Sequence, residues 1–231
     1  MSKRFKRNKN ASDDTLVDIG EKTEQAQDFY GKNQSLILGG LLAFVIVVGG
    51  IFAYNNFYKA PRLQSAIEEM AQAQRMFEKD SFALALANPG GGSLGFLDLA
   101  SDYSGTSAGN LANYYAGISY LNLGQFDAAK SYLEDYSPDG SVLPITYYGA
   151  LGDVYSEKNE MEKAISHYKK AIGQGTNEFL EAYYTKKLGM LYEYQGKVAE
   201  AKSTYENLQS KYPNTPEGQD IEKYISRVSV N

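Results

Sequence analysis

The chain is 231 residues long, which leaves room for a polar tail, a membrane span and one folded domain of ordinary size. It contains no cysteine and one histidine, His167, so disulfides, thiolate metal sites, cysteine nucleophiles, histidine-based triads and transition-metal sites are excluded. Residues 59–231 carry 16 basic and 22 acidic side chains, an acidic balance that argues against nucleic acid as a partner. We expect no catalytic residue, no cofactor and no metal site, and interpret His167 as structural.

Residues 1–34 form the polar tail. Five basic side chains lie between Lys3 and Lys9. Positive charge of this kind favours the cytoplasmic side of a membrane, although the basic residues nearest the following apolar stretch are almost equally divided between its two sides. We therefore expect residues 1–34 to be a basic, largely disordered cytoplasmic tail.

The apolar stretch Ser35–Tyr54 predicts a membrane span at residues 35–55. Twelve of its residues are Leu, Ile, Val or Phe, and no charge lies between Lys32 and Lys59. A helix needs about 20 such residues to cross the hydrocarbon core of a lipid bilayer. A cleaved signal peptide fits less well, because its apolar core has only about 7–15 residues. The small residues Gly39 and Ala43, and again Gly49 and Ala53, would allow a second membrane helix to approach, an alternative left open here.

Residues 56–109 read as an amphipathic helix followed by irregular and helical segments. Pro61 suits the first turn of a helix. From Leu63 to Phe77 the apolar residues recur with a helical period, which favours a helix docked on the domain behind it. The two heptads are too few to argue for a coiled coil.

Residues 110–213 contain three repeats that align on Gly117, Gly152 and Gly189. At fixed offsets from these glycines come a tyrosine, a turn former (Gly124, Asn159 or Gly196), an alanine, and a large residue sixteen positions on. Small residues at such places let two helices approach closely, and paired helices stack into a superhelix with a concave side. We assign repeat packing to Gly117, Tyr120, Ala129, Gly152, Tyr155, Ala164, Gly189, Tyr192 and Ala201.

The concave side is the candidate binding groove for a protein or peptide segment. Its tyrosine-rich surface with few charges suits an extended or helical peptide with apolar side chains, while packing between repeats is the alternative role for several of the tyrosines. The candidate groove residues are Leu111, Tyr114, Tyr115, Ile118, Asp153, Tyr183, Lys186, Lys187, Met190 and Tyr194. Residues 214–231, with apolar side chains on one face only, predict a helix that caps the exposed end of the solenoid.

Period and motif resemble the tetratricopeptide repeat, with Leu-Gly-x-x-Tyr at 151–155 and 188–192 and Ala-Gly-x-x-Tyr at 116–120. The resemblance implies an all-α fold: one N-terminal transmembrane helix, a tetratricopeptide-repeat α-solenoid and a C-terminal capping helix. The aromatic residue expected at the fourth motif position is Tyr148 in the middle repeat but Asn113 and Thr185 in the others. The carboxylate clamp of chaperone-binding members would rest on Lys186 and Lys187 alone, which argues against it.

The order of tail, span, amphipathic helix and the segment 103–117 also resembles the membrane-anchored periplasmic proteins typified by the ancillary subunit of the Sec translocon (YfgM-like), particularly in Bacteroidota. That resemblance implies a single-pass inner-membrane protein with a cytoplasmic N-terminus and a periplasmic domain. Its expected partners are Sec translocon subunits and periplasmic folding factors. The alternatives are an envelope scaffold for cell division or outer-membrane assembly, and a chaperone-like holdase for exported chains.

Overall fold

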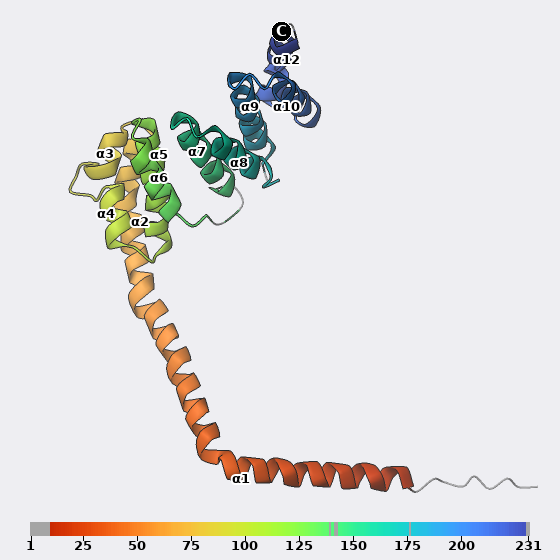
Figure 1. The fold of residues 1–231 in the computed structure, drawn as a ribbon. Coiled ribbons are helices and arrows are strands. Elements are labelled where there is room, and N and C mark those ends of the chain that lie inside the picture. The colour runs from red at the N-terminus through yellow and green to blue at the C-terminus, as the bar shows by residue number, and fades with distance from the viewer. Residues whose placement is uncertain (1–9, 139, 141–142, 176, 230–231) are drawn as a thin grey trace, which may run out of the picture. The chain divides into compact units, whose positions relative to one another are not determined.

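The computed structural model describes residues 10–138, 140, 143–175 and 177–229, with side chains from Phe29 onward, and all regular structure in these residues is helical (Figure 1). The chain divides into two compact units, residues 1–60 and residues 61–231. The all-α prediction is therefore confirmed. The basic residues from Lys3 to Lys9 lie outside the described residues.

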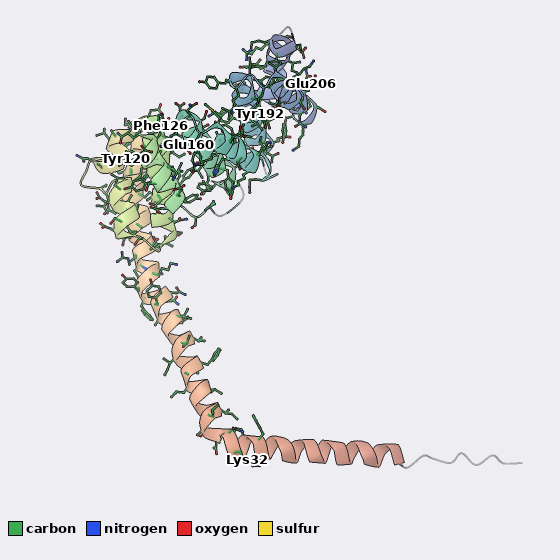
Figure 2. The ribbon with its side chains drawn as sticks, viewed as in Figure 1. Lys32, Tyr120, Phe126, Glu160, Tyr192 and Glu206 are labelled. Atoms are coloured by element: carbon green, nitrogen blue, oxygen red, sulfur yellow. The ribbon has the colours of Figure 1, made fainter. Side chains whose placement is uncertain are left out.

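The first unit contains the long helix α1, Asn10–Ala53, which includes the predicted span. Its apolar side chains are uncovered, with Leu36 75% and Phe52 64% exposed. Figure 2 shows side chains standing out from this helix beyond Lys32. The helix is long and apolar enough to cross a membrane. Residues 10–34 are helical, whereas the sequence predicts a largely disordered tail there; once a helix has been nucleated, as in the span, adding further residues to it costs little.

A wide helical turn follows the span. The π-helical segment η1, Tyr54–Lys59, ends with the Ala60 N–H donating to the carbonyl of Asn55. Pro61 comes next and lies in the first turn of α2, Ala60–Phe77, as the sequence predicts. Proline has no N–H to offer and its ring collides with the carbonyl four residues back, so the wider turn before it suits this position.

The second unit begins with a core built around α2. Ala66, Met70 and Ala73 are buried against α3, Phe82–Ala87, α4, Phe96–Asp102, and α5, Ser107–Asn122. This confirms the predicted docking of the amphipathic helix on the domain. We call these residues, with the others packed around them, the N-terminal cluster.

Three helix hairpins follow: α5 with α6, Phe126–Asp135; α7, Leu143–Glu157, with α8, Met161–Ile172; and α9, Glu178–Tyr194, with α10, Val198–Lys211. The predicted turn formers Gly124, Asn159 and Gly196 all have positive φ, between 58° and 72°. That left-handed conformation ends the first helix of each pair and is accessible chiefly to glycine and asparagine.

Each repeat glycine lies under the large residue sixteen positions later. A Cβ added at Gly117 would lie 2.6 Å from Leu133 Cγ, and one at Gly152 would lie 2.5 Å from Tyr168 Cδ1; Gly189 meets Tyr205 in the same way. The alanines Ala129, Ala164 and Ala201 are fully buried between the same helices. Of the three tyrosines at offset three, Tyr155 and Tyr192 are buried, and Tyr120 is half-buried with its ring 5.4 Å from that of Tyr132. In each hairpin the glycine of the first helix therefore leaves the space that the large side chain of the second helix fills.

The predicted capping helix is divided in two, α11, Pro216–Asp220, and α12, Glu222–Ser229. Thr215 caps the first of these, its hydroxyl accepting from the Gly218 N–H at 3.1 Å and donating to the Tyr212 carbonyl at 2.9 Å. Ile221 and Val228 are buried against the last hairpin. We call the core that runs from α6 to α12 the repeat cluster.

Candidate binding groove

The inner helices α5, α7 and α9 enclose a cavity of about 1210 Å³. The helices α7 and α9 each line it with positions i, i+4, i+7 and i+11, which lie on one face of a helix. On α7 these are Thr146, Ala150, Asp153 and Glu157, and on α9 they are Tyr183, Lys187, Met190 and Tyr194. On α5 the corresponding positions are Leu111, Tyr115, Ile118 and Asn122, of which Ile118 and Asn122 line the groove, together with the neighbouring Tyr114 and Leu121.

Seven of the ten candidate residues line this groove: Tyr114, Ile118, Asp153, Tyr183, Lys187, Met190 and Tyr194. Several of these side chains are open to solvent, Tyr194 at 75%, Met190 at 46% and Tyr183 at 40%. The groove thus presents apolar surface that no part of the described chain covers.

The other three candidates lie elsewhere. Tyr115 stacks on Phe96, with ring centroids 5.0 Å apart, and Leu111 packs in the same N-terminal cluster. Packing against α2 to α4 thus keeps Leu111 and Tyr115 out of the groove, which α5 lines with Tyr114, Ile118, Leu121 and Asn122. Lys186 is not one of the four groove positions of α9; its ammonium lies over the Tyr224 ring of α12, 5.2 Å from the ring centre.

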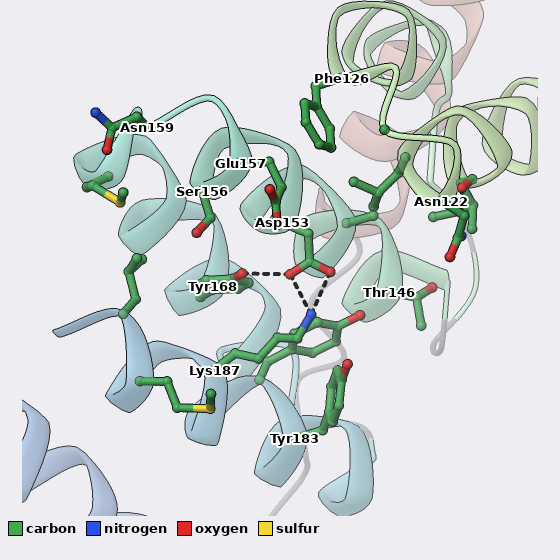
Figure 3. A pocket seen from close by; sticks show the side chains of 18 of the residues that line it. Asn122, Phe126, Thr146, Asp153, Ser156, Glu157, Asn159, Tyr168, Tyr183 and Lys187 are labelled. Atoms are coloured by element: carbon green, nitrogen blue, oxygen red, sulfur yellow. Dashed lines mark hydrogen bonds and ion pairs between the residues drawn. The ribbon is translucent and has the colours of Figure 1, made fainter. Parts of the chain in front are cut away.

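The groove centre is polar. Lys187 Nζ lies 2.7 and 2.8 Å from the two carboxylate oxygens of Asp153, and the Tyr168 hydroxyl donates to Asp153 Oδ1 at 2.6 Å (Figure 3). Burial alone would lower the pKa of Lys187, but the attraction of Asp153 outweighs it and raises that pKa. Burial, and then the charge of Asp153, raise the pKa of Tyr168, so its hydroxyl stays protonated and remains a donor. The charge of Lys187, the only lysine among the described residues of the groove, is therefore already balanced by Asp153.

Models of the tetratricopeptide repeat match residues 111–137, 145–174 and 187–215. These are the three hairpins described above. The chain carries three tetratricopeptide repeats. A comparison with curated proteins gives no match. The matched residues cover the repeats and leave out α1 to α4, so they identify the repeats and not a more specific family.

Several groove residues of the tetratricopeptide repeats are absent from the sequence prediction, among them Asn122, Phe126, Glu157 and Tyr184. Asn122 and Glu157 lie four residues beyond Ile118 and Asp153, so extending the predicted face by one turn finds them. Phe126 opens the second helix of its repeat, and no periodicity on the first helix signals it. Tyr184 covers Gly149 of the preceding repeat, where a Cβ would collide with its ring.

His167 lies on α8 with its ring 5.1 Å from that of Tyr155. Burial, and then the charge of Lys170, lower its pKa, which keeps the imidazole neutral at pH 7. The described residues contain no group of three or more His, Asp or Glu side chains that could hold a metal ion. The tetratricopeptide repeats offer a surface for binding, and the groove is a hollow on it.

Proposed function

We propose that the chain is a membrane-anchored, non-enzymatic scaffold whose groove binds an extended segment of another protein. This rests mainly on the groove surface. The helices α7 and α9 each line it with four positions, α5 adds further residues beside them, and exposed tyrosine and methionine side chains cover part of it. Packed helices lie about 8–10 Å apart, so three of them span about 16–20 Å, the length of about five or six extended residues. Alternating side chains of such a segment would enter the groove.

In this proposal the bound segment is an internal stretch of the partner protein and not its C-terminus. A clamp for a C-terminal carboxylate needs free cations, and Lys187, the one cation among the described residues that line the groove, is paired with Asp153. An internal stretch brings apolar side chains and no terminal charge, which fits the lining.

For location, we propose a single span that holds the repeats on the periplasmic face of the inner membrane, beside the Sec translocon and periplasmic folding factors. The apolar helix and the basic residues near the N-terminus support this orientation. A tether raises the local concentration of the groove near membrane-bound partners.

The test of the partner is crosslinking in intact cells. A photo-reactive amino acid replaces Tyr194 at the open rim of the groove, and in a matched control it replaces Glu206, which is exposed on α10 (Figure 2). Secretion-channel subunits or folding factors should crosslink at position 194 and not at 206. Equal capture at both positions would contradict the groove, and capture of division or outer-membrane assembly proteins alone would favour that alternative.

The orientation has a separate test, because the chain contains no cysteine. A single cysteine at the exposed Ser226 should react with a membrane-impermeant maleimide once the outer membrane is opened, whereas one at Ser2 should react only after the inner membrane is dissolved. The reverse pattern would place the repeats in the cytoplasm.

A further inference from the structure

Three charged side chains line the groove, Asp153, Glu157 and Lys187. The two carboxylates are four residues apart on α7 and therefore share a face. Lys187 neutralises Asp153. The side chain of Glu157 is exposed and forms no ion pair or hydrogen bond with the described residues. The groove therefore keeps one uncompensated negative charge.

The groove is also rich in aromatic rings: five tyrosines line it, Tyr114, Tyr168, Tyr183, Tyr184 and Tyr194. The face of such a ring attracts a cation. Lys187 already shows the arrangement, because its ammonium is paired with Asp153 and lies 5.1 Å from the centre of the Tyr183 ring. A carboxylate and a tyrosine together hold one cation at this point.

A carboxylate and a tyrosine also stand at the last positions of the groove face on α7 and α9. Glu157 ends the face on α7, and Tyr194 ends it on α9. No cation among the described lining residues serves them, because Lys187 is the only one and it is engaged. Tyr194 is 75% exposed, so a guest side chain can reach its ring.

We propose that the groove selects an apolar extended segment that carries one positively charged side chain, arginine or lysine, held by Glu157 and Tyr194. This rests on the proposed function and adds the charge of the segment to it. Arginine suits the place better than lysine, since its planar guanidinium stacks on a ring while donating to a carboxylate. An acidic side chain at the same point is repelled by Glu157.

The experiment measures fluorescence anisotropy of labelled peptides with the full-length protein in lipid nanodiscs, with empty nanodiscs as the background. The probes are end-blocked Ala-Leu-Val-X-Val-Leu-Ala peptides with a neutral fluorophore, in which X is Arg, Gln or Glu. An exposed ion pair and a cation–ring contact together predict about 5- to 30-fold tighter binding of the Arg peptide than of the Gln peptide. The Glu peptide should bind more weakly than either, and the Arg advantage should shrink in 0.5 M NaCl.

The matched variants are Glu157→Gln and, as control, Glu206→Gln, which removes an equal charge from an exposed site outside the groove. Glu157→Gln should reduce the Arg preference to the part that the Tyr194 ring supplies and leave the Gln peptide unaffected, while Glu206→Gln should change neither. Equal affinity for the Arg and Gln peptides in the unmodified protein overturns the charge selection and leaves the scaffold function standing. An Arg preference that Glu157→Gln does not reduce also overturns it, and no binding of any peptide overturns both proposals.

Discussion

Replacing Gly152 by alanine is expected to loosen the middle hairpin. The added Cβ would lie 2.5 Å from Cδ1 and Cε1 of Tyr168. That ring has little freedom to move, because it is 4% exposed and its hydroxyl is bonded to Asp153. Overpacking of this kind costs about 1–3 kcal/mol, and replacing glycine inside a helix returns about 0.5–1 kcal/mol. The net loss is about 1–2 kcal/mol.

The measurement is hydrogen–deuterium exchange of peptides from α7 and α8 in the full-length protein, under conditions where closing outpaces exchange. Since 1.4 kcal/mol is a factor of ten, exchange of the protected amides should accelerate about 5- to 30-fold. Gly40→Ala is the control, because a Cβ there meets no atom within 4 Å. It should leave these peptides unchanged.

A second background makes the reasoning refutable. In Tyr168→Ala the ring is gone, so Gly152→Ala should now stabilise the hairpin by about 0.5–1 kcal/mol through helix propensity alone. The sign of the effect therefore reverses between the two backgrounds. The same acceleration in both would show that contact with Tyr168 is not the cause.

Three further predictions concern the turns, the cap and acid stability. Asn159→Gly should leave the repeats as stable or slightly more so, whereas Asn159→Val should cost about 1–2 kcal/mol in urea unfolding, because φ is +58° there; equal effects would contradict this. Thr215→Val should cost about 1 kcal/mol by leaving the buried Gly218 N–H without its acceptor, and an unchanged urea midpoint would argue against the cap. Arg227 holds the pKa of Glu193 below its ordinary value of 4.5, chiefly through their hydrogen bond, so this pair stabilises the fold above pH 4.5 and is lost as the pH falls through the lowered pKa. The free energy of unfolding, measured with urea, should fall less between pH 7 and pH 3 in Arg227→Gln than in the unmodified protein. The difference should be below about 1 kcal/mol because Arg227 is half-exposed, and an identical fall would contradict the prediction.

The repeats are predictable from sequence because each depends on a local rule. Gly152 lies where a helix must approach a large side chain, and Asn159 lies where φ is positive, so residue type reports the backbone directly. The groove face on α7 and α9 follows from helical period for the same reason.

The prediction of groove residues fails where contacts with distant segments of the chain determine the position of a side chain. Tyr115 has the period of a groove residue, but Phe96 and Phe77, far away in the sequence, take its ring into another core. Lys186 is one residue away from the groove position Lys187, and its contact with Tyr224 depends on how the capping helices fold back. Neither contact leaves a periodic signal on its own helix.

The α5–α6 hairpin belongs to both hydrophobic clusters. Its first helix supplies Ala112 and Ala116 to the N-terminal cluster, its second helix supplies Ala129 and Leu133 to the repeat cluster, and Tyr120 packs against both. In a chain of stacked helix pairs, cooperativity is transmitted through the contacts between neighbours. Heating should therefore melt the second unit in a single step, and the N-terminal cluster should not stay folded beside the span once the repeats have unfolded.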